Sequence, residues 1–375
     1  MKYSFLIFIT IGFVLSTQAQ REKVYPFTKV LKSAEFYAEQ AQLWKVAVEE
    51  NKQDGDAWYN YYCAARMTNA KTGKQAYDLN GITADILQTV PNTFESEFIQ
   101  FWNGSWSKED KEHLKKAYEL APERTEPYRD LMALYAQEGN EVKAKEFATK
   151  FYEQDEYSRG LVNWSYNQLM SVEDNAILLT AGDNDSFFGW MVQYHHGVKP
   201  NVILASSWLL TIKDTQTTLL RKLNLPDFPK DKEDFESRNE HRLAIIDHII
   251  KHTDRPVYLG VGCGEREGRY QDKLYQVGLA YRYSEEHFDN FAILQNNVEN
   301  HFLLDYLKQE MQPDFGQSVT HQANQFYISP FLILYRHYKD SGELEKANQL
   351  KKLIKKVAAQ GSNAASIEDY LASLD

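Results

Sequence analysis

The chain has 375 residues and a formal net charge of −11, with 42 Lys and Arg against 53 Asp and Glu. This acidic balance argues against nucleic acid as a partner, because binding to phosphates requires a basic face. The two cysteines, Cys63 and Cys263, exclude a disulfide-dense scaffold. We expect buried thiols at both positions, with a single bridge as the alternative. The length allows two or three domains with their own cores.

Residues 1–19 are predicted to be a secretory signal peptide. Lys2 supplies the positive start, residues 5–15 form an apolar run, and Ala19 is a small residue at the expected cleavage point. The run is shorter than the roughly 20 apolar residues that cross a bilayer, although an uncleaved anchor is an alternative. We therefore expect an exported chain, periplasmic or secreted, with no membrane span after cleavage.

Residues 20–170 are predicted to be a tetratricopeptide-like helical region. The spacing of that repeat is matched by Tyr128, Leu131, Tyr135, Gly139 and Ala144. Gly139 would make the turn between two helices, and the small Ala144 would let the second helix approach the first. A similar pair is marked by Trp58, Tyr61 and Ala65, and the offsets recur at Leu334, Tyr338, Gly342 and Ala347.

The last of these matches lies within residues 285–375, which are predicted to be C-terminal helices that include a tetratricopeptide-like pair. Helical pairs on both sides of a central module would form a concave surface. We expect a protein partner to bind there.

Residues 171–284 are predicted to be a small α/β module. The β-rich runs are 176–180, 201–206, 256–261 and 278–283, and helical stretches at 187–196, 214–223 and 237–252 separate the first three. Such alternation favours βαβ units and a Rossmann-like, mostly parallel sheet. The last run is interpreted as an antiparallel edge strand. The predicted fold class is therefore α/β plus α, with tetratricopeptide-like repeats flanking the module.

Two carboxylates, Asp183 and Asp185, follow the first predicted strand. Ligands of open α/β sheets bind beyond the carboxyl ends of the strands, so these residues define a candidate site. Their oxygens could hold Mg²⁺, Mn²⁺ or Ca²⁺, the one cofactor that the sequence suggests. The alternative is that Asp183 or Asn184 caps the following helix.

Other polar and aromatic residues extend this candidate site. His195 and His196 could be metal ligands or a general base, although a helix C-terminus favours them structurally as well. Arg282 would point to solvent or, if inward, pair with the acidic turn. The candidate ligand pocket therefore consists of Asp183, Asn184, Asp185, Trp190, His195 and Arg282.

A glycine-rich segment, Gly260–Gly264, follows the third predicted strand. It lacks the spacing of a nucleotide-binding loop. We expect it near the Asp183 turn, at the rim of a pocket. Cys263 lies within it, and no His or Asp at a recognisable spacing supports a nucleophile there.

Three stretches resemble the soluble C-terminal part of multi-pass envelope proteins of the protein O-mannosyltransferase-like kind (glycosyltransferase family 117). The matching residues are Gly182, Asp183, Asn184, Asp185, Ser186 and Phe187 with Trp190, Gln193, Gly197 and Val198, then Arg255–Tyr258, then Gly278–Arg282. The resemblance covers roughly residues 160–360. It implies a free-standing accessory domain linked to glycan or glycoprotein assembly, with a small glycan-like molecule as a possible ligand.

The departures from that family concern activity. Phe188 replaces a proline, residues 209–215 do not follow the family pattern, and the membrane-embedded half that would hold the catalytic centre has no counterpart. The favoured hypothesis is therefore a non-catalytic exported binding or scaffolding module. The alternative is a divalent-metal-dependent hydrolase or transferase acting on a sugar or phosphate ester at the Asp183/Asp185 turn.

Overall fold

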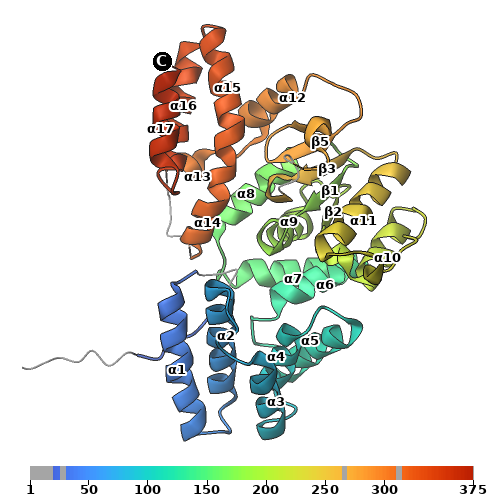
Figure 1. The fold of residues 1–375 in the computed structure, drawn as a ribbon, viewed down its shortest axis with the longest axis vertical. Coiled ribbons are helices and arrows are strands. Elements are labelled where there is room, and N and C mark those ends of the chain that lie inside the picture. The colour runs from blue at the N-terminus through green and yellow to red at the C-terminus, as the bar shows by residue number, and fades with distance from the viewer. Residues whose placement is uncertain (1–19, 26–30, 264–267, 310–314, 375) are drawn as a thin grey trace, which may run out of the picture.

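The computed structural model describes residues 20–25, 31–263, 268–309 and 315–374. Helices form most of the fold and surround one small sheet (Figure 1). The predicted signal segment, 1–19, lies outside the described residues. No helix in the described part of the chain has the length and apolarity needed to span a membrane.

The prediction that the N-terminal region is helical throughout is confirmed. Its helices are α1 (Ala34–Glu50), α2 (Gly55–Thr72), α3 (Leu79–Thr89), α4 (Phe94–Asn103), α5 (Lys108–Leu120), α6 (Tyr128–Glu138), α7 (Glu141–Glu153) and α8 (Arg159–Met170). Short polar side chains cap most of their N-termini. Ser33, Asp54 and Ser107, for example, each accept a backbone N–H from the first turn of the helix that follows.

The predicted helix pair around Gly139 is also present. Gly139 joins α6 to α7 in the left-handed region, with φ 73°, and Ala144 is completely buried between the two helices. Near the C-terminus the same arrangement recurs in α15 (Ile328–Asp340) and α16 (Leu344–Ala358). There Gly342 has φ 79° and Ala347 is buried. The remaining C-terminal helices are α12 (Phe291–Asn296), a π-helical turn (Asn297–His301), α13 (Asp305–Lys308), α14 (Gln317–Asn324) and α17 (Ala364–Ser373).

The sheet is mixed, and the prediction of a mostly parallel sheet is wrong. Its strands are β1 (Ile177–Thr180), β2 (Ile203–Ser206), β3 (Val257–Gly260), β4 (Leu274–Gln276) and β5 (Ala280–Tyr283), in the order β2-β1-β3-β5-β4. β1 pairs in parallel with β2 and β3, whereas β5 is antiparallel to both β3 and β4. β5 is antiparallel, as the sequence indicated, but the short strand β4 covers it, so β5 is not an edge strand.

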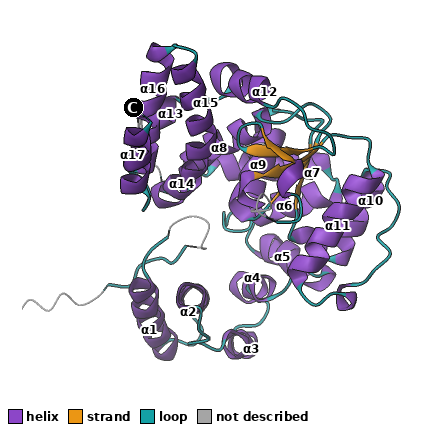
Figure 2. Ribbon diagram, turned by 45° about the horizontal axis from the view of Figure 1, so that its top comes forward, coloured by secondary structure: helices purple, strands orange, loops and turns teal. Residues whose placement is uncertain are grey.

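Both faces of the sheet are buried. Leu178 of β1 joins an apolar cluster with α9 (Asp183–His196) and the N-terminal helices, while Ile177 and Leu179 join a second cluster with α11 (Arg238–His252) and the C-terminal helices. Successive strand residues point to opposite faces, so β1 contributes to both clusters. α6, α7 and α8 pack against α9 (Figure 2). The helical region and the α/β module therefore share a core.

Candidate functional site

The acidic turn after β1 is organised by the Asp185 carboxylate. Asp185 Oδ2 accepts a hydrogen bond from the Ala181 backbone N–H at 2.8 Å, and Oδ1 accepts one from Gly182 at 2.7 Å. Asp185 is only 8% exposed. It lies in the first turn of α9 and reaches back to the residues that link strand to helix. The residue that caps this turn is thus Asp185, and not Asp183 or Asn184.

The loop after β3 meets this turn, as the sequence predicted for the glycine-rich segment. A Cβ built on Gly262 would lie 3.2 Å from Asp185 Oδ2. β2 lies on one side of β1 and β3 on the other, so the chain after β1 is built outward in both directions. The turn therefore occupies the topological switch point of the sheet. Burial raises the pKa of Asp185 to about 6, against the opposing effect of the backbone hydrogen bonds from Ala181 and Gly182. Gly264 lies outside the described residues.

Asp183 lies near two arginines of the N-terminal helices. Burial raises the pKa of Asp183, and the positive charges of Arg129 in α6 and Arg66 in α2 act in the opposite direction. The guanidinium groups of Arg66 and Arg129 lie 4.9 and 5.3 Å from the Trp102 ring. Arg129 is also 5.1 Å from the Phe187 ring of α9. The acidic turn therefore lies at the contact between the helical region and the α/β module.

The two carboxylates do not form part of a larger ligand set. In the described part of the chain, no group of three or more His, Cys, Asp and Glu side chains could hold a metal ion. The Asn184 Oδ1 atom is buried and has no hydrogen-bond partner among the described residues. Both oxygens of Asp185 accept backbone N–H groups. The geometry accordingly resembles a structural turn more than an open catalytic centre.

His195 is not brought to this turn. It lies at the other end of the 14-residue helix α9, which rises about 1.5 Å per residue. Its ring stacks on Tyr152 at 4.2 Å, and its Nδ1 lies 3.1 Å from Thr149 Oγ1. His196 contacts the edge of the same tyrosine ring. The two histidines therefore contribute to the packing of α9 against α7.

Arg282 pairs with a different carboxylate from those that the sequence suggested. Its Nη1 lies 2.6 Å from Glu173 Oε1, and its guanidinium is 5.0 Å from the Phe288 ring. β5 runs antiparallel to β3, and Arg282 pairs with Tyr258 near the amino end of β3. The acidic turn lies beyond the carboxyl ends of β1 and β3. Arg282 is therefore partly exposed to solvent, and the inward-pointing alternative, an ion pair with Asp183 or Asp185, is not formed.

Trp190 lies in the middle of α9, away from the acidic turn. Its indole N–H donates to the Leu204 carbonyl at 3.1 Å, and its ring stacks on Phe187 at 5.6 Å. It also lines a cavity of about 210 Å³ whose walls include neither Asp183 nor Asp185. Of the six residues of the predicted ligand pocket, Asp183, Asn184 and Asp185 thus lie together in the acidic turn, whereas the other three lie elsewhere.

The cysteines are not joined by a disulfide. Cys63 is buried, and burial raises the pKa of its thiol to about 12. Cys263 donates from Sγ to the Leu179 carbonyl at 3.3 Å. The expectation of separate thiols is confirmed, but only Cys63 is buried; Cys263 is partly exposed, so the expectation of burial is wrong there.

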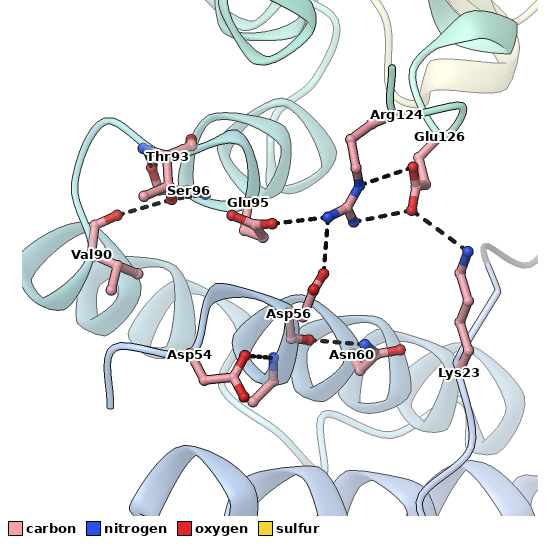
Figure 3. Close-up of polar contacts among 11 residues, drawn as sticks. Lys23, Asp54, Asp56, Asn60, Val90, Thr93, Glu95, Ser96, Arg124 and Glu126 are labelled. Carbon is pink, nitrogen blue, oxygen red and sulfur yellow. Dashed lines mark hydrogen bonds and ion pairs between the residues drawn. The ribbon is translucent and has the colours of Figure 1, made fainter. Parts of the chain in front are cut away.

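A charged network between the N-terminal helices was not predicted from the sequence (Figure 3). Arg124 Nη1 lies 2.9 Å from Asp56 Oδ1 and 3.1 Å from Glu95 Oε1, and Nη2 lies 3.0 Å from Glu126 Oε1. Lys23 also approaches Glu126, at 3.7 Å. Glu126, in the segment before α6, is a sequence neighbour of Arg124. Asp56 in α2 and Glu95 in α4 are distant in the sequence, so no local spacing indicates them. Arg124 holds these three parts together.

The fold defines a helical-repeat protein that carries a small mixed α/β module. No family model and no curated protein sequence matches this chain. Among solved structures, it is similar to yeast Tom70 with a TM-score of 0.26 and 15% sequence identity, over 91% of this chain and 59% of the yeast chain. This chain thus spans less than two thirds of that protein, and at this TM-score the likeness gives no basis for transferring a function.

Proposed function

We propose that this chain is a non-catalytic scaffold of the cell envelope that binds a protein partner through its helical pairs. The apolar segment 5–15 supports export, and the Gly182–Phe187 motif supports a link to glycan or glycoprotein assembly. The structural role of Asp185 favours binding over catalysis at the acidic turn. The observation that carries the proposal is a groove beside α16.

This groove lies between α16 and the segment 298–308 and has a volume of about 750 Å³. Its apolar floor includes Leu304, Leu350 and Leu353. Leu350 and Leu353 are each 8% exposed and pack mainly in the C-terminal core, so the partly buried Leu304 offers the larger apolar surface to the groove. Such a floor suits apolar side chains of an extended or helical segment.

Lysines surround the floor. The groove is lined by Lys308, Lys346, Lys352 and Lys356. Lys346 pairs with Glu299 at 3.0 Å, whereas Lys352 is exposed and has no ion-pair partner in the described part of the chain. α16 itself carries five lysines and one glutamate, on a chain of net charge −11. Because these positive charges are concentrated on one helix of an otherwise acidic chain, the groove favours an acidic partner.

The occupant is therefore an acidic segment of a partner protein that also carries apolar side chains. Opposite charge would speed its encounter with the groove and would set its orientation. The apolar floor would supply most of the affinity, because exposed ion pairs contribute little.

The test uses the full chain and fluorescent peptides in which Glu or Asp alternates with Leu. We expect anisotropy to report binding that weakens with salt, and Lys352→Glu with Lys356→Glu to weaken it about tenfold or more, that is, by about 1.4 kcal/mol. The matched control is Lys45→Glu with Lys251→Glu, two exposed lysines on other helices. Equal binding by both double variants, or binding only by a second copy of this chain, would overturn the proposal.

A further inference from the structure

The cavity beside Trp190 lies where the helical region meets the α/β module. Its walls come from α6, α7, α9, β2 and α10 (Lys213–Lys222), and its volume is about 210 Å³. Sites that enclose drug-sized ligands have volumes of roughly 300–1,000 Å³. The cavity is therefore suited to a small molecule. It is separate from the lysine-lined groove of α16 and from the acidic turn.

One side of the cavity is apolar. It is lined by Trp190 together with Val202, Leu204, Leu210 and Leu219. The indole N–H of Trp190 is already used by the Leu204 carbonyl, so the ring offers only an apolar surface. An apolar or aromatic body would bury its surface here, away from water.

One polar residue of the cavity wall, Gln137, has an unused donor. Gln137 Oε1 accepts a hydrogen bond from the Thr215 hydroxyl at 3.1 Å. Its Nε2 is buried and has no acceptor among the described residues. The neighbouring Gln193 differs, because its Nε2 donates to the carbonyls of Lys199 and Val202. A buried donor without an acceptor destabilises the fold, and an oxygen of a bound molecule would accept its hydrogen bond.

Two cations line the cavity where it opens to solvent. Lys145 of α7 and Lys222 of α10 are exposed, and neither has an ion-pair partner in the described ranges. Glu141 is the one acidic residue among the cavity walls. The balance of these three side chains favours a single negative charge.

We propose that this cavity binds a small amphipathic carboxylate. The apolar body lies against Trp190 and the leucines, an oxygen accepts the hydrogen bond of Gln137 Nε2, and Lys145 and Lys222 attract the negative charge. Because α6 and α7 face α9 and α10 across the cavity, such a ligand would also strengthen the contact between the helical region and the α/β module.

The probes are phenylacetate and hexanoate, with benzyl alcohol as a neutral analogue, added to the full chain. We expect the two acids to raise the melting temperature and to change the tryptophan fluorescence, and the alcohol to bind about tenfold more weakly. Gln137→Leu should weaken binding of both acids about tenfold. Gln154→Leu is the matched control, since Gln154 also has a buried unpartnered amide but does not line the cavity.

A second variant does not depend on the buried amide. Lys145→Ala with Lys222→Ala changes two exposed side chains and should weaken the acids without affecting benzyl alcohol. The proposal is overturned if neither acid binds at millimolar concentration. It is also overturned if Gln137→Leu and the double lysine variant both bind the acids as well as the unaltered chain does.

Discussion

The Asp185 carboxylate accepts a hydrogen bond from the backbone N–H of Gly182 at 2.7 Å and so joins the end of β1 to the first turn of α9. Its other oxygen accepts the N–H of Ala181. The residue type that suggested a metal ligand thus satisfies two backbone donors that the strand and the helix leave unpaired. This relationship makes the acidic motif testable as a structural element.

Removal of this carboxylate should destabilise the protein. Asp185→Ala leaves the N–H groups of Ala181 and Gly182 without their acceptor, so we expect a loss of about 1–3 kcal/mol in the free energy of unfolding. Asp183 is not the acceptor for these two N–H groups, and Asn has nearly the same shape as Asp. Asp183→Asn should therefore lower the free energy of unfolding by less than about 1 kcal/mol. Urea unfolding of both variants measures the difference. Equal losses would contradict the capping role of Asp185.

The same carboxylate should make stability depend on pH. The folded-state pKa of Asp185 is raised from 3.8 to about 6, chiefly by burial. Between these values the folded chain holds a proton that the unfolded chain releases. The stabilisation is therefore complete below about pH 4 and is lost as the pH rises through about 6. Compared with that of Asp185→Asn, the free energy of unfolding of the unaltered chain should fall by on the order of 2–3 kcal/mol over this range, at about 1.4 kcal/mol per pH unit. A difference in the free energy of unfolding between the unaltered chain and Asp185→Asn that stayed constant from pH 4 to 7 would refute this.

The Arg124 network should contribute more to stability than an exposed ion pair does. Arg124→Ala leaves Glu126, whose side chain is 8% exposed, and Glu95 without their partner. Loss of one partner from a fully buried pair costs about 3–5 kcal/mol; because Arg124 is 23% exposed, we expect about 2–3 kcal/mol. Lys213→Ala, which removes an exposed pair with Asp231, should cost less than about 1 kcal/mol.

The effect of Arg124→Ala should also decrease in acid. Burial acts to raise the pKa of Glu126, but the hydrogen bonds and charge of Arg124 lower it overall. The contribution of this pair is therefore present at neutral pH and is lost as the pH falls through the lowered pKa. Denaturant unfolding at pH 7 and pH 3 tests this, and an undiminished difference at pH 3 would argue against the ion pair.

Two glycines should respond differently to alanine. Gly139 has φ 73° with no atom within 4 Å of an added Cβ, so Gly139→Ala should cost about 1 kcal/mol for backbone conformation alone. Gly182 has φ −149°, and an added Cβ would lie 4.0 Å from Asp185 Oδ1. Gly182→Ala should therefore change stability by less than about 0.5 kcal/mol. Thermal unfolding measures the stability of the two variants, and a lower melting temperature for Gly182→Ala than for Gly139→Ala would disprove the prediction.

Divalent ions should leave the stability unchanged if the acidic turn is structural. We expect no rise in melting temperature with millimolar Mg²⁺, Mn²⁺ or Ca²⁺, because both Asp185 oxygens already accept backbone N–H groups. A ligand that binds only the folded state would raise it. A rise that disappears in Asp183→Asn would instead support the metal-dependent hydrolase or transferase.

Features that depend on neighbouring residues could be predicted from the sequence. The helix pairs at Gly139 and Gly342 were identified because a left-handed glycine and a small residue five positions later are local requirements of such a pair. The parallel strands were identified because β1, β2 and β3 are short apolar runs separated by amphipathic helices. β4 was missed, since Leu274–Gln276 is too short to show a strand pattern.

The sequence by itself therefore determined the helical pairs, the strand before the acidic turn and the charge of the chain, because each depends on residue types at short spacing. Only the tertiary structure decided what those residues contact. Because β5 runs antiparallel to β3, Arg282 lies beside Glu173. His195 and Asp185 lie near opposite ends of α9. Packing of α6 and α7 on α9 creates the cavity at Gln137. These are relations between distant segments, fixed by burial and strand direction, which no local pattern records.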